Sequence, residues 1–199
     1  MWANISDRLR FREASLCIVH ISSRDANIFG TLSLAVADRV RARAITSVPL
    51  RGESIACVIA VSTFARGCSI EQLSRIVGLS HSATVRLVDR LATDGFLRRD
   101  AAPDRRVVAI NPTPAGERAA AAIREARAAA LRELLGSLSI VERVEFSRLN
   151  EKVLAAMITA DSVPVRICRL CDVDGCGHDA GRCPVTEAGR RLRAEAAGG

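Results

Sequence analysis

The chain has 199 residues, which suits one domain with extensions, and its 49% hydrophobic and 3% aromatic content predicts a helical core of Ala, Leu, Ile and Val. The net charge of +7 favours a polyanionic partner, although arginine-rich usage also fits GC-rich coding. No apolar run reaches the roughly 18–20 residues of a membrane span and no signal peptide is evident, so we expect a cytoplasmic protein without a membrane partner.

The first part of the chain predicts two helices after a segment that is hard to assign. Residues 1–24 have mixed composition and are treated as an N-terminal extension. Asp25 is expected to cap a long helix that ends near Ser47. A second, compact apolar helix is predicted from Glu53 to Ala65.

Residues 69–95 read as a helix–turn–helix. Ser69 and Gln72 form a capping-box pattern that marks the start of a short helix. Gly78 supplies the left-handed residue that ends this helix and makes a tight turn. Ser80 then caps a second helix, residues 81–94, whose apolar side faces inward.

A two-stranded wing is predicted at residues 96–111. Residues 96–99 and 107–110 read as short strands, and the intervening segment contains the Pro and Asp residues that are typical of turns. A helix–turn–helix followed by such a hairpin predicts a winged helix.

This layout suits a DNA duplex, because the small polar side chains in the first turn of the second helix could reach base edges in the major groove. Arginines further along the helix and at the wing tip would bind phosphates or a flanking minor groove, and an acidic residue at the tip would orient them. The candidate DNA-binding residues are Ser80, His81, Ser82, Thr84, Arg86, Arg90, Asp104, Arg105 and Arg106. The alternatives are an ordinary piece of core and a winged helix that binds a protein.

Two amphipathic helices are predicted after the wing. Thr113-Pro114 begins a helix rich in Ala and Arg, and Ser139 with Glu142 begins another that ends near Ala160. The economical way to cover these helices and residues 25–47 is a two-fold dimer, and the alternative is packing of three helices within one chain. The predicted fold is therefore mainly α with a small β-wing. The winged-helix domain is predicted at residues 25–160, and its dimerisation helices are residues 25–47 and 113–160.

Residues 161–199 form a tail with four cysteines in a short stretch, Cys168, Cys171, Cys176 and Cys183. Thiolates bind Zn²⁺ tetrahedrally, although the second half of the spacing is irregular and His178 could replace one ligand. An iron–sulfur cluster would use the same ligands, and a disulfide-based redox switch is a third reading. Cys57 is expected in the core, and Cys68 is expected to be inert.

The stretch from about Leu50 to Met157 resembles the MarR family of bacterial winged helix–turn–helix regulators. The motifs that carry the resemblance are Ile70-Glu71-Gln72-Leu73, Gly78-Leu79-Ser80, residues 84–91, Asp94-Gly95-Phe96-Leu97, Asp104-Arg105-Arg106 and Thr113-Pro114-Ala115-Gly116. The resemblance implies an obligate homodimer that binds double-stranded DNA through the recognition helix and wing and that often releases it on binding a small molecule. Asn111-Pro112 departs from the family pattern at the end of the wing.

We therefore expect a homodimeric repressor of a pseudo-palindromic operator, released by a small-molecule, metal or redox signal. The alternative is a winged-helix protein-interaction module with a metal-binding or redox-sensing tail. We do not expect an enzyme, because the sequence contains no convincing Ser/His/Asp set, phosphate-binding glycine loop or HExxH motif.

Overall fold

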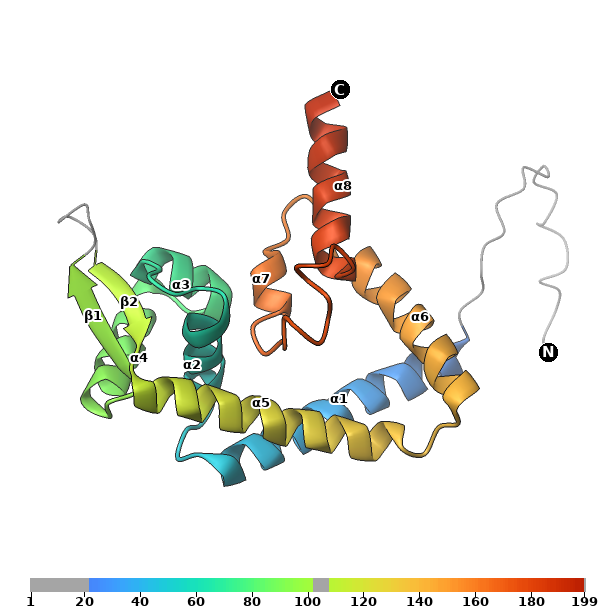
Figure 1. Cartoon of the computed structure of the whole chain (residues 1–199). Helices are drawn as coiled ribbons and strands as arrows, with labels where there is room; N and C mark the ends of the chain where they lie inside the picture. Colours follow the sequence, from blue (N-terminus) through green and yellow to red (C-terminus); the bar gives the residue numbers. More distant parts are fainter. Residues whose placement is uncertain (1–21, 102–107, 199) are drawn as a thin grey trace, which may run out of the picture. The chain divides into compact units, whose positions relative to one another are not determined.

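The computed structural model describes residues 22–101 and 108–198 (Figure 1). Their elements are α1 (Ser23–Ser47), α2 (Glu53–Thr63), α3 (Ile70–Val77), α4 (His81–Thr93), β1 (Leu97–Ala101), β2 (Val108–Pro112), α5 (Pro114–Leu135), α6 (Ile140–Ala156), α7 (Pro164–Ile167) and α8 (Pro184–Gly198). The predicted fold class, mainly helical with a small wing, is confirmed. The chain divides into two compact units, and the division falls within α1, after Ala35.

Helix α2 is the centre of the core. It buries eight consecutive residues, Ser54 to Val61, so it is enclosed on all sides and does not present one apolar stripe. It packs against α3, α5 and β2. Because α2 reaches all three elements, it fixes the helix–turn–helix relative to α5.

The ends of α3 have the predicted capping chemistry. The Ser69 Oγ accepts from Gln72 N–H at 3.2 Å, and the Gln72 side chain accepts from Ser69 N–H at 2.9 Å. Gly78 closes the helix in the left-handed region with φ of 72°. The turn between α3 and α4 is therefore specified by local sequence.

The wing consists of β1 and β2 paired antiparallel, from Leu97 opposite Pro112 to Ala101 opposite Val108. Cys68 adds one further antiparallel bridge to Ile110, with Ile110 N–H donating to Cys68 O at 2.9 Å. This bridge joins the chain before α3 to the wing.

The junction between the wing and α5 is tight. Thr113 caps α5 by accepting from Gly116 N–H at 3.1 Å, and its backbone N–H donates to Phe96 O at 3.0 Å. A Cβ added at Gly116 would stand 2.0 Å from that same Phe96 oxygen. Only glycine allows α5 to approach the start of β1 this closely.

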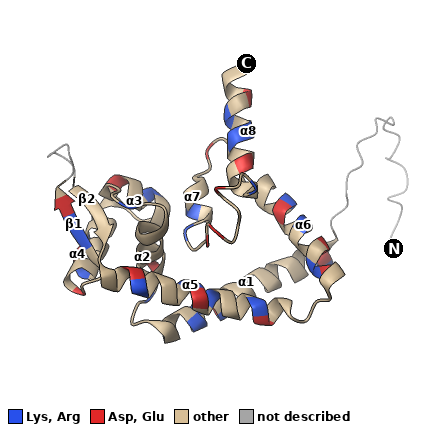
Figure 2. Ribbon diagram, in the orientation of Figure 1, with Lys and Arg blue, Asp and Glu red and all other residues tan. Residues whose placement is uncertain are grey.

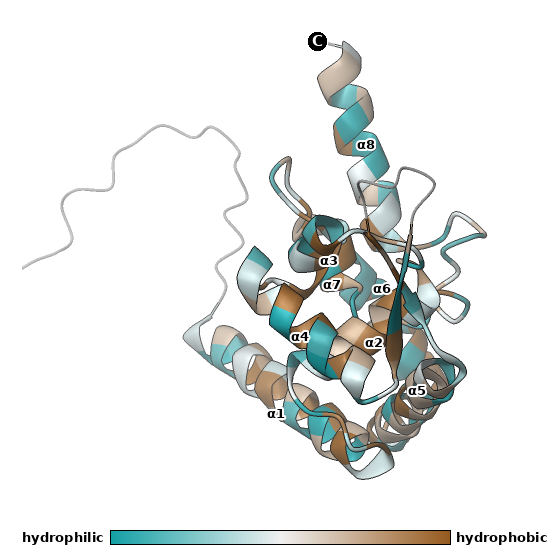
Figure 3. Cartoon of the chain, turned by 90° about the vertical axis from the view of Figure 1, so that its left-hand side faces the viewer, coloured by the Kyte–Doolittle hydropathy of each residue, from teal (hydrophilic) through white to brown (hydrophobic). Residues whose placement is uncertain are grey.

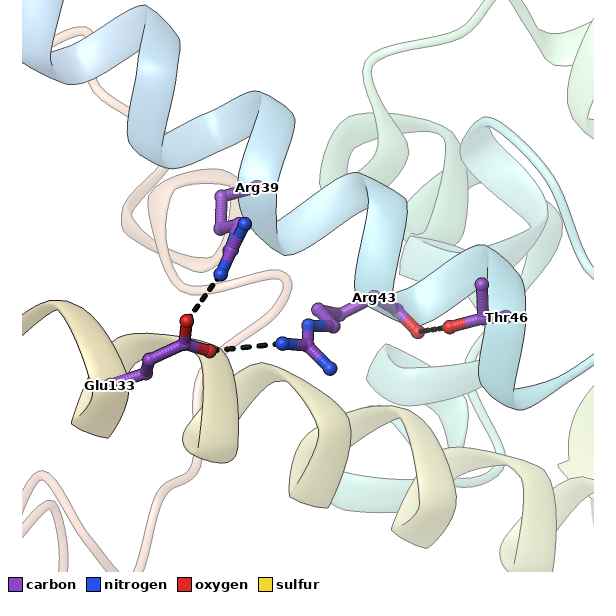
Figure 4. A network of polar contacts seen from close by, with 4 residues as sticks. All are labelled: Arg39, Arg43, Thr46 and Glu133. Carbon is purple, nitrogen blue, oxygen red and sulfur yellow. Dashed lines mark hydrogen bonds and ion pairs between the residues drawn. The ribbon is translucent and has the colours of Figure 1, made fainter.

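Ion pairs join the C-terminal half of α1 to α5 (Figure 4). The Glu133 carboxylate on α5 accepts from the guanidinium groups of Arg39 and Arg43, the latter at 2.9 Å. The Thr46 hydroxyl donates to Arg43 O at 2.8 Å. The three charged side chains are about half exposed, and solvent screens ion pairs at such positions. The pairs therefore contribute little to the free energy of unfolding, and their main effect is to orient α1 relative to α5.

The start of α1 differs from the prediction. Ser22, not Asp25, occupies the capping position, because Asp25 N–H donates to Ser22 Oγ at 3.1 Å and the Ser22 hydroxyl donates to the Asp25 carboxylate at 2.6 Å. The prediction of Asp25 as the cap is therefore wrong by one turn.

Apolar side chains are exposed on α1 and α6. Helix α1 carries both apolar and polar segments (Figure 3), and Phe29 and Leu34 are 53% and 71% exposed. Helix α6 buries no residue, and Val141 and Val144 are 78% and 67% exposed. Within the described part of its own compact unit, α6 therefore leaves these apolar side chains exposed.

The cysteine tail is folded and belongs to the same compact unit as the winged helix. It contains α7 and α8, which the sequence analysis did not predict. Helix α7 packs against α3, and α8 packs against α6. Among the described residues, no helix is both long enough and apolar enough to cross a membrane.

Candidate nucleic-acid interface

The first turn of α4 is a small, polar and exposed surface. Ser80 caps the helix by accepting from Ala83 N–H at 3.3 Å, and its hydroxyl also lies 3.3 Å from that of Ser82. His81 and Ser82 are exposed beside it. The helix N-terminus carries partial positive charge and unpaired N–H groups, so this turn can approach a polyanion closely.

Thr84 does not belong to this surface. Its side chain is fully buried, and its hydroxyl donates to Ser80 O at 2.9 Å. The predicted contact of Thr84 with DNA is therefore wrong, because the side chain is buried and its hydroxyl donates to a backbone oxygen of the same turn.

The two arginines of α4 differ in their surroundings. Arg86 is exposed and forms no ion pair within the described residues. Arg90 is also exposed, but its guanidinium donates to the Ser54 hydroxyl on α2 at 3.2 Å. Arg86 is therefore the freer cation for a phosphate, whereas Arg90 also ties α4 to α2.

The wing side of the interface contains charged contacts that the sequence did not predict. Arg99 on β1 donates to Asp89 on α4 at 2.7 Å, which connects the strand to the recognition helix. Asp100 accepts from Arg98 at 2.6 Å and from the Asn111 amide at 2.7 Å. In Figure 2, β1 accordingly shows basic and acidic colouring along one strand.

Asn111, the departure from the family pattern, therefore has a structural role. It positions the Asp100 carboxylate across the wing, while the following Pro112 is buried at the end of β2. The predicted wing-tip residues Asp104, Arg105 and Arg106 lie outside the described residues, so their contact with DNA stays a prediction.

The isolated cysteines of the core have unfavourable surroundings for a thiolate. Burial, with a smaller effect of neighbouring Cys68, raises the pKa of Cys57 to about 12. Burial likewise raises the pKa of Cys68 to about 11. Both thiols are therefore protonated at neutral pH, in agreement with the expected core and inert roles.

The four tail cysteines are neighbours, since each alters the pKa of others. A hydrogen bond from Cys171 lowers the pKa of Cys168 and correspondingly raises that of Cys171. Burial is the main cause that raises the pKa of Cys176 to about 12. Burial also acts on Cys183, but hydrogen bonds from the Thr186 hydroxyl and N–H outweigh it and lower the pKa.

Residues 57–107, which run from within α2 through α3, α4 and β1 and end before β2, match the model of the MarR family. The helix–turn–helix of this chain is therefore similar to that of the MarR family. The resemblance predicted from the sequence is thereby confirmed. No curated protein matches the chain.

Solved structures agree with this assignment over more than the winged helix. A MarR family protein from Bacillus stearothermophilus is 26% identical, with a TM-score of 0.60 over 69% of this chain and 98% of that one. The apo form of wild-type MarR from E. coli is 18% identical, with a TM-score of 0.55 over 65% of this chain and 96% of that one. CouR from Rhodococcus jostii RHA1, bound to p-coumaroyl-CoA, is 21% identical with a TM-score of 0.52, over 68% of this chain and 93% of that one. The MarR-type fold thus extends from the winged helix to the flanking helices.

Proposed function

We propose that the chain is a DNA-binding transcriptional regulator that acts as a homodimeric repressor of a pseudo-palindromic operator. The observation that carries the proposal is the exposed polar first turn of α4, held by a capped helix–turn–helix beside a wing of the MarR family. A duplex groove admits one such helix, and the positive end of the helix faces the phosphates.

Binding to duplex DNA can be measured by fluorescence anisotropy, with DNA selected from a random library, over a series of salt concentrations. We expect Kd to rise steeply with salt concentration. Each phosphate that the protein neutralises adds about 0.9 to the slope of log Kd against the logarithm of the salt concentration. Arg86→Ala should weaken all sequences alike and reduce that slope, whereas Ser82→Ala should change the preferred bases. Arg190→Ala on α8 removes the same charge from an Arg190–Glu187 pair away from α4 and serves as the control.

A chain that shows no salt-dependent affinity for any duplex contradicts this proposal. That result would support the second candidate function, a winged helix that binds a protein partner. Equal losses for every sequence from both Ser82→Ala and Arg86→Ala would argue against the reading of bases.

The dimer is supported by the uncovered apolar surface of α6 and α1. Ile140, Val141 and Val144 are each more than 60% exposed in the single chain, and such surface is unusual on a monomer. Light scattering on a sizing column should give twice the chain mass of 21.3 kDa. Val144→Asp should shift the equilibrium to monomer, since it places a charge in the dimer contact, and a monomeric native chain at micromolar concentration would disprove this part.

A small-molecule effector is supported by a cavity of about 220 Å³ between α1, α2 and α5. Its apolar lining residues include Val40, Ile59 and Ile123. Three basic residues and one acidic residue also line it, namely Arg41, Arg127, Arg169 and Glu53. Apolar walls with cationic groups favour a small anion with an apolar body.

The effector can be tested by adding benzoate to the preformed DNA complex, with neutral benzamide as the matched control. Release by benzoate alone, lost in Arg127→Ala, is the expected result. If benzoate and benzamide release the DNA equally, the cavity does not recognise the charge of the ligand. If neither compound releases the DNA, the proposal that this cavity binds the effector is contradicted.

A further inference from the structure

A cavity of about 220 Å³ lies against the starts of α7 and α8, and all four tail cysteines line it. None of these four, Cys168, Cys171, Cys176 and Cys183, is in a disulfide. Four cysteine residues therefore border one small space, and thiolate sulfur is the ligand that Zn²⁺ prefers in closed structural sites.

The backbone brings these sulfurs together by tight turns. Cys171 N–H donates to Cys168 O at 2.8 Å, which closes a turn between the first two cysteines. Between the last two, Gly177 and Gly181 adopt positive φ values of 69° and 66°, which let the chain reverse direction. The gathering of the sulfurs is therefore a property of the chain path.

The tail has little apolar core to hold this path. Its buried cluster contains only Ile158, Cys183 and Val185, with partly buried side chains packed around them. So few buried groups cannot offset the conformational entropy of ordering about 40 residues. A bound metal ion would supply the missing folding free energy.

Neighbouring groups fit four thiolate ligands. His178 also borders the cavity, but its Nδ1 lies 3.0 Å from the Thr186 hydroxyl, which already orients the ring. Within the described residues no group of three or more His, Cys, Asp or Glu side chains is arranged to hold a metal ion, so the four cysteine side chains must rearrange for Zn²⁺ to bind.

We propose that Cys168, Cys171, Cys176 and Cys183 bind one Zn²⁺ ion as four thiolates, and that this ion holds the tail against the helix–turn–helix. Each thiol releases its proton to solvent on binding, so the loaded site carries two net negative charges. No oxidation or reduction is involved.

Three contacts connect this site to the winged helix. Helix α7 packs against α3. The guanidinium of Arg166 on α7 stands at the turn between α3 and α4, where a Cβ added at Gly78 would be 2.7 Å from its Cζ. Leu170, between the first two ligands, packs against the main core. Loss of zinc would therefore loosen the tail from the turn that precedes the recognition helix, a regulatory effect that rests on the function proposed above.

The first test is the metal content of the full-length protein, purified without added metal. We expect about one Zn²⁺ per chain by elemental analysis, and a near-complete loss in Cys171→Ser and Cys183→Ser. Cys68→Ala, which removes a thiol outside the tail, should keep its zinc. Since a serine variant could fail to fold, wild-type protein is also stripped with chelator and reloaded with Co²⁺, and a tetrathiolate absorption spectrum is expected.

Zinc that persists in both serine variants would overturn the site, as would a stripped protein that takes up neither Co²⁺ nor Zn²⁺. A brown protein with iron and sulfide in place of zinc would also overturn it. Disulfides among the four cysteines in protein purified under reducing conditions would replace the proposal with a thiol switch.

The second test compares duplex affinity of the zinc-loaded and stripped proteins at one salt concentration. A change of at least about tenfold in Kd, reversed by added Zn²⁺, supports the regulatory effect and corresponds to about 1.4 kcal/mol. Equal affinities of the two forms overturn the coupling. If neither form binds any duplex, the proposed function is wrong. The metal content still tests whether the four cysteines bind Zn²⁺.

Discussion

Substitution of Gly116 by alanine should destabilise the protein, although alanine is the better helix former. The added Cβ would stand 2.0 Å from Phe96 O, and real Cβ contacts are not closer than 3.0 Å, so α5 and the start of β1 must separate by about 1 Å. That movement strains the hydrogen bond from Thr113 N–H to the same oxygen, now 3.0 Å long.

The magnitude follows from three contributions. Overpacking against backbone costs about 1–3 kcal/mol. A weakened hydrogen bond costs about 1 kcal/mol, and the gain in helix propensity from Gly to Ala returns about 0.5–1 kcal/mol. The net loss of about 1–3.5 kcal/mol corresponds to a fall in Tm of about 2–14 °C for a chain of this size.

Thermal unfolding followed by circular dichroism, at one protein concentration, measures this fall. Gly198→Ala is the control, because it is also a helical glycine but its added Cβ would meet no atom within 4 Å. A Tm of Gly116→Ala equal to or above that of the wild type would refute the reasoning, since propensity alone raises it.

Three further predictions concern the core and the helix–turn–helix. Leu91→Ala should cost about 2–5 kcal/mol in denaturant unfolding, because Leu91 is fully buried, and a loss below 1 kcal/mol would contradict that packing. Ser69→Ala should lower the free energy of unfolding by about 1 kcal/mol in the same assay, because the capping box is lost. An unchanged denaturant midpoint would show that the cap does not stabilise the protein. Cys57 and Cys68 should resist a thiol reagent at pH 8 in the native protein and react in denaturant. Because their folded pKa values of about 12 and 11 exceed the ordinary 9.0, native stability should fall as pH rises from 9 through 12, and a flat profile would contradict the raised values.

Local chemistry explains what the sequence could predict. The capping box at Ser69, the left-handed Gly78 and the cap at Ser80 depend on residues within four positions of one another, and the structure has all three. The wing strands were predicted within two residues of their observed ends for the same reason. Such features require no knowledge of distant contacts.

Long-range contacts could not be predicted in this way. Nothing in the spacing connects Arg90 to Ser54 or Arg99 to Asp89, because these pairs depend on how α4 packs on α2 and the wing. Thr84 illustrates the same limit, since its place in the first turn of the second helix suggested a contact with DNA, whereas packing buries its side chain.

Some missed features did have a signal. The Ser22-x-x-Asp25 spacing is a cap pattern, and the structure uses it. Helix α8 begins with Pro184 and has Glu187 in its first turn, which is a usual helix start. The cysteine spacing in this segment indicated metal ligands, and no helix was predicted there.

The uninterrupted length of α5 has a consequence for insertions. Its 22 residues span about 33 Å and join the wing junction at Thr113 to the ion pairs of Glu133. One inserted residue in the middle would rotate one end about 100° around the axis relative to the other, so Glu133 would turn away from Arg39 and Arg43. Seven inserted residues make close to two full turns, so they would restore the orientation of Glu133 about the helix axis while lengthening α5 by about 10 Å. Comparison of the two insertions therefore distinguishes the effect of rotating Glu133 from the effect of moving it along the axis.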